Sequence, residues 1–181
     1  MRSKQGILTI AATLLLIFLM SCSQAGKAGP YYFLDHFNSG SIFPKNITIP
    51  GTPTGLPVFV LDEVTAGQKR PALITLADFK ITFDVGQLGQ APRLKFGAGM
   101  NSTIGSGAVG IVTVEADGNS EVVYRRYINP IDRPEDRRWF DESVDLSKFA
   151  GKKVTISFGA GRGPKFDATA AWFLWSNLEL D

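Results

Sequence analysis

Residues 144–158 read Val-Asp-Leu-Ser-Lys-Phe-Ala-Gly-Lys-Lys-Val-Thr-Ile-Ser-Phe, and two patterns in this stretch decide the fold. In its first half, Asp145 can cap a single helical turn in which Leu146 and Phe149 share one face at a spacing of three. Gly151 can end this turn because glycine adopts a positive φ without steric cost. In the second half, apolar residues alternate with Thr and Ser, which is the period of a strand with one buried face. The stretch therefore predicts a short turn that leads into a strand.

The same alternation recurs along the rest of the chain, whereas helical periodicity is almost absent. Short runs rich in Val, Ile, Phe, Tyr and Thr predict strands within residues 31–37, 56–61, 73–85, 93–96, 109–115, 121–128, 153–158 and 170–180. Residues 116–120 contain Asp-Gly between two such runs and predict a hairpin turn. This pattern favours a single all-β domain, a β-sandwich or jelly roll, without an internal repeat.

Three segments near the C-terminus resemble galactose-binding-like jelly-roll domains. They are Trp139-Phe140-Asp141, the turn and strand of residues 144–158, and the run from Trp172 to Trp175-Ser176-Asn177. The resemblance implies a galactose-binding-like fold, because these residues mostly build a turn and the core. Domains of this family are often carbohydrate-binding modules, alone or fused to glycosidases and sulfatases. The fold also hosts lipid-binding, protein-binding and purely structural roles.

The N-terminus resembles the signal peptide of a bacterial lipoprotein. Arg2 and Lys4 precede an uncharged apolar run, residues 7–20. As a helix this run would span about 21 Å, which is short of the roughly 30 Å hydrocarbon core of a bilayer. The next feature, Leu19-Met20-Ser21-Cys22, resembles a lipobox, and this implies cleavage before Cys22 and a lipid on its thiol. The alternative is an ordinary signal peptide with a chance cysteine.

These features divide the chain into three parts. We expect residues 1–21 to be a signal peptide that is removed, residues 22–30 to be the lipidated cysteine and a flexible tether, and residues 31–181 to be the sandwich domain. The lipid would hold the domain on the extracytoplasmic side of the cell envelope. Ser23, rather than Asp, follows the lipidated cysteine, and by the sorting rule of Gram-negative lipoproteins this implies the outer membrane.

Charge and cysteine count exclude several classes of function. Of the 19 basic residues, Arg2 and Lys4 lie in the segment that would be removed, so the mature chain has as many basic as acidic side chains, 17 of the latter. A neutral domain is a poor partner for nucleic acid, because phosphate neutralisation dominates that affinity. Cys22 is the only cysteine, and lipidation would leave none for a disulfide, a thiolate nucleophile or a cysteine metal site.

No set of residues identifies an enzyme. The only histidine, His36, lies beside Asp35 and near Ser39, but a catalytic triad needs side chains that converge from different segments. The 17 acidic residues allow many carboxylate pairs of the kind that glycosidases use, and no spacing singles one out. We therefore expect a binding protein rather than an enzyme, with no cofactor required.

The family resemblance implies one metal. Galactose-binding-like domains often carry a structural Ca²⁺ near the joined chain ends. By resemblance, the residues that could supply its oxygen ligands are Asp35, Asn38, Ser39 and Glu179. The chain has no contiguous calcium loop, and a polar turn with an exposed glutamate would explain the same residues.

Residues 124–139 concentrate arginine, acidic and aromatic side chains in a segment that turns rather than continues as a strand. Arginine presents a planar fork suited to carboxylate and sulfate, and aromatic rings stack on the apolar face of a sugar. We expect Trp139 to be exposed. Residues 170–174 are apolar at every position, which predicts a strand buried on both faces, so we expect Trp172 and Trp175 to lie in the core. The candidate ligand-binding residues are Trp139, Arg125, Arg126, Arg137, Arg138, Arg162 and Phe166. The alternative is a hairpin whose charges pair with each other.

The sequence favours a lipid-anchored, non-catalytic binding module in the cell envelope, with glycan as the ligand. Two alternatives stay open: a structural or assembly lipoprotein that docks another envelope protein, and a jelly-roll glycan hydrolase or lyase. Glycan binding predicts an aromatic groove or a loop-tip site with a few polar groups. Protein docking predicts a flatter apolar patch, and an enzyme predicts two titratable groups in a cleft.

Overall fold

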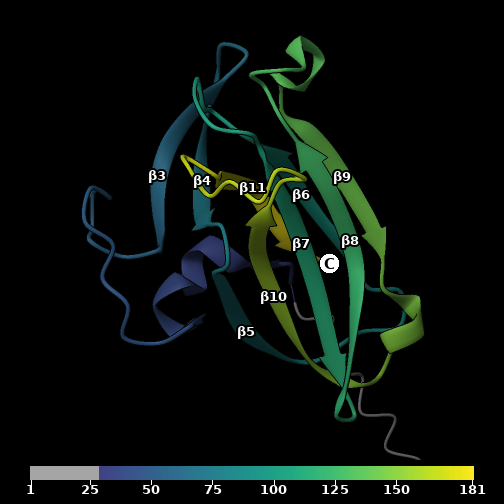
Figure 1. The fold of residues 1–181 in the computed structure, drawn as a ribbon. Coiled ribbons are helices and arrows are strands. Elements are labelled where there is room, and N and C mark those ends of the chain that lie inside the picture. The colour runs from purple at the N-terminus through teal and green to yellow at the C-terminus, as the bar shows by residue number, and fades with distance from the viewer. Residues whose placement is uncertain (1–28) are drawn as a thin grey trace, which may run out of the picture.

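The computed structural model describes residues 29–181, which form two antiparallel β-sheets packed face to face (Figure 1). The expected signal peptide and Cys22 lie outside the described residues. The strands are β1 (Tyr31–Tyr32), β2 (Ser41–Phe43), β3 (Val58–Thr65), β4 (Gln68–Leu76), β5 (Lys80–Gln87), β6 (Arg93–Gly99), β7 (Ala108–Ala116), β8 (Asn119–Ile128), β9 (Phe140–Asp145), β10 (Lys153–Arg162) and β11 (Trp172–Leu180). Short 3₁₀ helices are η1 (Phe33–Ser39), η2 (Pro134–Asp136) and η3 (Ser147–Phe149). Within residues 29–181, no helix has the length and apolar character needed to cross a bilayer.

The two sheets have crossed connections. The first has the order β3-β4-β11-β6-β9, with β1 paired to β11, and the second has the order β2-β5-β10-β7-β8. The last strand, β11, thus lies between β4 and β6, which come much earlier in the chain. The edge strands β8 and β9 belong to different sheets and lie along the same margin of the sandwich (Figure 1). This architecture confirms the predicted all-β sandwich of jelly-roll type.

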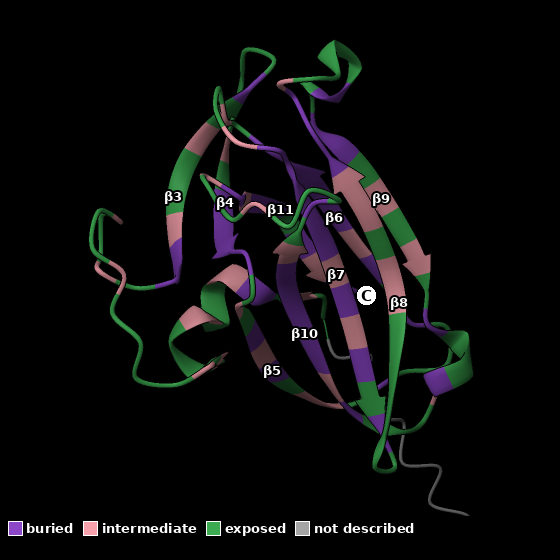
Figure 2. Ribbon diagram, in the orientation of Figure 1, coloured by how far each residue is buried: buried purple, intermediate pink, exposed green. Residues whose placement is uncertain are grey.

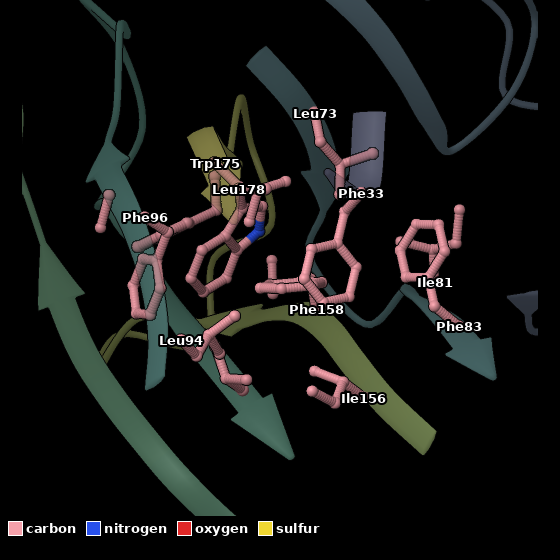
Figure 3. Close-up of a cluster of buried hydrophobic side chains, with 14 of the residues drawn as sticks. Phe33, Leu73, Ile81, Phe83, Leu94, Phe96, Ile156, Phe158, Trp175 and Leu178 are labelled. Carbon is pink, nitrogen blue, oxygen red and sulfur yellow. The ribbon is translucent and has the colours of Figure 1, made fainter. Parts of the chain in front are cut away.

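The core lies between the sheets and consists largely of aromatic and branched apolar side chains (Figure 3). Trp175 is fully buried on β11, and its ring centroid lies 5.6 Å from that of Phe96 and 5.5 Å from that of Phe158, both in edge-on contacts. The indole N–H of Trp175 donates to Thr75 Oγ1 at 3.0 Å, so the one polar atom of this ring is satisfied. As predicted, β11 is buried on both faces, because a second apolar cluster covers the side that faces away from the core.

The predicted turn is present between β9 and β10. Asp145 Oδ1 accepts a hydrogen bond from the backbone N–H of Ser147 at 2.8 Å, at the start of η3. Leu146 is fully buried and Phe149 is 7% exposed, so both residues pack into the core. Gly151 ends the turn with a φ of +73°, which only glycine adopts without strain.

The hairpin predicted at residues 116–120 joins β7 to β8. Asp117 and Gly118 have φ values of +53° and +74°, the left-handed conformations that two-residue hairpin turns require. The first half of β8 beyond this turn is exposed (Figure 2), so the hairpin extends past the end of the core.

Two of the predicted strands are wrong in part, and two strands were missed. Residues 31–37 form a strand only as far as Tyr32, because Phe33 turns inward and is fully buried against Phe158. Residues 73–85 are two strands, since the chain leaves the first sheet at Leu76 and enters the second at Lys80. The missed strands are β2, which is only three residues long, and β9, in which Phe140 and Val144 are the only apolar residues; both strands lie at the edge of a sheet.

Candidate functional site

Three connections at one end of the sandwich line a half-open cavity of about 490 Å³, which we call the loop-end cavity. They are the β3–β4 turn, the loop of residues 100–107 between β6 and β7, and the loop of residues 129–139 between β8 and β9. These connections lie at the top of Figure 1. The residues that line the cavity are Val64, Thr65, Ala66, Met100, Asn101, Ser102, Thr103, Pro130, Ile131 and Arg137.

The lining combines apolar walls with a few hydrogen-bonding groups. Asn101 Nδ2 donates to Glu63 Oε2 at 3.2 Å, and Ser102 Oγ donates to the carbonyl of Ile104 at 2.6 Å, so two of the polar side chains are held in place. Thr65 is 4% exposed, and its Oγ1 finds no hydrogen-bond partner in the described part of the chain. Arg137 is the only residue with an ionisable side chain among those that line the cavity.

The β8–β9 loop is fixed by a buried asparagine that sequence reasoning did not single out. Asn129 is 2% exposed, and its Oδ1 accepts from the backbone N–H groups of Ile131 and Asp132 at 3.1 and 3.2 Å. The backbone N–H of Asn129 donates to Oδ2 of the buried Asp136 at 2.8 Å. The Asn-Pro dipeptide that starts this loop signalled a turn, but not the burial of its side chain. These bonds make the loop a rigid support for Arg137.

Two of the predicted arginines belong to the margin of the sandwich and not to the cavity. Arg126 on β8 forms an ion pair of 2.7 Å with Glu142 on β9, and its guanidinium carbon lies 3.7 Å from the ring centroid of Phe140. Arg138 lies over the same ring at 4.6 Å. Tyr124 shares Glu142, and burial together with this carboxylate raises the pKa of the Tyr124 phenol well above its usual range. The contacts of Arg126 and Tyr124 with Glu142 connect the edge strands of the two sheets.

The expectation that Trp139 is exposed is wrong. It is 7% exposed and packs against Gly99, where a Cβ would lie 2.9 Å from the indole ring. Its Nε1–H donates to the carbonyl of Gln68 at 3.1 Å, and the guanidinium of Arg70 lies 5.2 Å from its ring centroid. Arg70 also pairs with Asp141, and this contact lowers the pKa of the Asp141 carboxyl below its ordinary value. The charges around Trp139 therefore cover the ring instead of leaving it open.

Trp139 belongs to the second apolar cluster, on the face of the first sheet that points away from the core. The other buried members are Phe59, Ala72, Ile74, Leu76 and Leu174. Trp172 is half-buried beside them, with its ring centroid 5.7 Å from that of Phe59. Of the two tryptophans expected in the core, Trp175 lies there and Trp172 lies in this second cluster.

The remaining candidates are distributed as follows. Arg125 is exposed on β8. Arg162 pairs with Asp78 at 2.6 Å at the end of β10. Phe166 is 80% exposed in the loop of residues 163–171, and Lys165 in this loop lies 3.6 Å from Asp132 in the β8–β9 loop. Of the predicted ligand-binding residues, the structure thus places Arg137 in the cavity wall and Phe166 on a neighbouring loop.

The residues expected to hold calcium lie near the chain ends. Asp35, Asn38 and Ser39 are exposed on η1, and Glu179 on β11 pairs with Lys95 at 3.5 Å. Ser39 Oγ donates to the carbonyl of His36. Among residues 29–181, no three His, Cys, Asp or Glu side chains gather in a way that could hold a metal ion. Calcium binding stays a prediction.

No family model matches this chain. A protein of Archaeoglobus fulgidus, described as an uncharacterized protein, is 32% identical over 106 residues, which are 56% of this chain. The matched part covers 27% of that protein's length.

Several carbohydrate-binding modules have a similar arrangement of strands. The CBM51 module of a Clostridium perfringens GH95 protein, solved with methyl-galactose, is 17% identical with a TM-score of 0.46 over 78% of this chain and 88% of that one. The TmCBM61 structure with β-1,4-galactotriose is 16% identical, with a TM-score of 0.46, over 69% of this chain and 81% of that one. The tandem CBM51 modules of Sp3GH98 from Streptococcus pneumoniae are 17% identical, with a TM-score of 0.47, over 84% of this chain and 46% of that one. Similarity at this level assigns no ligand and no site residue to this chain.

Proposed function

We propose that this chain is a glycan-binding module, held at the cell envelope by a lipid on Cys22, and that it seats a saccharide in the loop-end cavity. One observation carries the proposal: a cavity of about 490 Å³ with mixed polar and apolar walls, built from three loops at one end of a rigid sandwich. Its volume falls within the range of about 300–1,000 Å³ that is usual for small-ligand sites. Binding residues commonly lie on loops that a rigid scaffold positions.

The chemistry of the walls suits a sugar. Asn101, Ser102 and Thr103 offer amide and hydroxyl groups that can exchange hydrogen bonds with ligand hydroxyls. Val64 and Ile131 add apolar surface, against which the C–H face of a pyranose can pack. The bonds within the β8–β9 loop support the proposal further, because a fixed site loses little conformational entropy on binding.

The cavity is better suited to binding than to hydrolysis. Acid–base cleavage of a glycosidic bond generally needs a pair of carboxyl groups that flank it. Arg137 is the only ionisable side chain among the lining residues, and the nearby Asp136 is buried and accepts the N–H of Asn129. The proposed role is therefore recognition, with the lipid anchor keeping the site at the membrane surface.

A glycan array probed with the full chain tests this function. Thr103→Trp should fill the cavity and reduce binding by at least about tenfold, because a bulky ring would occupy the space of the sugar. Ser120→Trp is the matched control, since Ser120 is exposed in the β7–β8 hairpin at the opposite end of the sandwich. The proposal fails if no glycan binds the parent chain, or if both variants bind as the parent does.

One observation favours the alternative of protein docking. A second, more open cavity of about 540 Å³ lies by the loop of residues 44–57, with Ile47 and Leu56 among its lining residues. Phe43, beside it, is 58% exposed, and Leu56 is 41% exposed. A photo-crosslinking residue at Leu56 should give one defined adduct in cells if a partner protein docks here, and none if this surface faces solvent.

A further inference from the structure

We infer that the saccharide held in the loop-end cavity is acidic, and that its carboxylate or sulfate pairs with Arg137. This inference rests on the proposed function and specifies the class of glycan. It starts from the charge of the cavity wall: Arg137 is the one ionisable side chain among the lining residues, and the carboxylate that contacts this wall, Glu63, accepts a hydrogen bond from Asn101.

Arg137 forms no ion pair with an acidic side chain of residues 29–181, unlike Arg70, Arg126 and Arg162. Other arginines, such as Arg125, also lack an acidic partner among these residues, but Arg137 is the one that lines the loop-end cavity. Two of the three acidic residues of its own loop have other partners, and the third, Glu135, is exposed and pairs with no cation of the described residues. Asp132 accepts from Asn129 Nδ2 at 3.0 Å and lies near Lys165, and Asp136 accepts the backbone N–H of Asn129.

The guanidinium of Arg137 is also held in one orientation. Its Nε–H donates to the carbonyl of Pro130 at 2.6 Å, in the loop that the side chain of Asn129 fixes. This bond uses the Nε donor and leaves the two Nη groups for other partners. A pair of parallel N–H donors matches the spacing of two oxygens on a carboxylate or a sulfate. The proposed partner of these Nη donors is an anion supplied by the ligand.

The rest of the wall explains why the anion would be carried by a sugar and not arrive as a free ion. Asn101, Ser102 and Thr103 lie in the same cavity as the guanidinium and can bind ring hydroxyls while Arg137 binds the acid group. A simple inorganic anion would leave these groups and most of the 490 Å³ unused.

The test compares acidic oligosaccharides with their neutralised forms. The probes are oligogalacturonate and its carboxyl-reduced counterpart, and a chondroitin sulfate oligosaccharide and its desulfated, carboxyl-reduced counterpart. Binding to the full chain in a non-ionic detergent is measured by calorimetry. We expect at least one acidic probe to bind at least about tenfold more tightly than its neutral form, because charge-assisted bidentate pairs are among the stronger polar contacts.

Three variants separate a specific pair from general attraction. Arg137→Gln should weaken binding of the acidic probe by about 10- to 100-fold, whereas Arg137→Lys should retain part of it, because the charge stays and the fork is lost. Arg125→Gln removes the same charge from exposed β8 and should have little effect. Thermal unfolding of each variant checks that the loop stays folded.

The outcomes distinguish the two proposals. If a neutral probe or another neutral glycan binds as well as the acidic ones, and Arg137→Gln leaves the affinity unchanged, the acidic class is wrong while glycan binding stands. If Arg125→Gln weakens binding as much as Arg137→Gln, the attraction is unspecific and the assigned pair is wrong. If the parent chain binds no glycan at all, the proposed function fails and this inference fails with it.

Discussion

Trp139 illustrates how far the surroundings of one residue decide its role. Charged neighbours in sequence suggested an exposed ring, but Gly99 leaves space for the indole on the outer face of the first sheet, and Arg70 closes over it. Glycine at this position of β6 is the local reason for the close approach, since any Cβ would meet the ring.

Replacing Trp139 with Ala should therefore destabilise the fold. We expect a loss of about 3–5 kcal/mol in the free energy of unfolding, the usual range for removing a buried aromatic side chain. Trp139→Phe should cost less, because it keeps part of the apolar contact while it loses the bond to Gln68 and part of the ring that Arg70 covers. Urea denaturation of the three proteins measures this. An unchanged midpoint for the Ala variant would mean that the ring is exposed after all.

Phe166 presents the opposite case, a large apolar residue that the fold does not explain. Its side chain is 80% exposed, and its backbone has a φ of +55°, a conformation that costs a non-glycine residue about 1–2 kcal/mol. It therefore contributes strain and little packing to the folded chain. Strained, exposed residues beside a cavity are candidates for ligand contact.

Replacing Phe166 with Gly tests this directly. Relief of the strained φ should offset the greater freedom of glycine in the unfolded chain, so the free energy of unfolding should be unchanged or rise by up to about 1 kcal/mol. Glycan binding should nevertheless weaken, and Phe166→Ala should weaken it equally. A fall in stability of more than about 1 kcal/mol in the Gly variant would show that the ring packs against the domain in solution.

At the scale of elements, the turn between β9 and β10 is the best supported part of the sequence analysis. Leu146→Ala and Phe149→Ala should each cost about 2–5 kcal/mol, because each removes buried apolar groups. Lys148→Ala removes a surface ion pair with Glu121 and a cation–π contact with Phe149, and it should cost no more than about 1 kcal/mol. Denaturant titrations compare the three variants with the parent. Equal stabilities would mean that the turn does not pack as described.

The margin formed by β8 and β9 was less accessible to sequence reasoning. The arginine-rich run suggested either a ligand site or charges that pair with each other, and the structure pairs one of its arginines with a carboxylate outside the run. Arg126 pairs with Glu142 across the two sheets, whereas Arg137, eleven positions later, has no acidic partner among the described residues. Spacing along the chain could not separate the two arginines, because the sheets that bring Glu142 to Arg126 are assembled from distant strands.

For the whole molecule, the lipid anchor remains the prediction with the simplest test. Cys22→Ala removes the thiol that would carry the lipid, so we expect loss of cleavage before residue 22 and loss of labelling by a palmitate analogue in cells. Arg125→Ala serves as a control that should be labelled like the parent. Continued labelling of the Cys22 variant would overturn the proposed anchor.

The sequence by itself determined the fold class, the hairpin at Asp117-Gly118, the turn at residues 145–151 and the burial of β11 on both faces. Each of these follows from local periodicity or from the φ preference of a few residues, and both are properties of neighbours in the chain. Only the tertiary structure decided which side chains face a cavity, which ring a glycine accommodates and which arginines pair with a carboxylate. Those properties depend on contacts between strands and loops far apart in sequence, and the pairing of such segments is set by the packing of the two sheets as a whole.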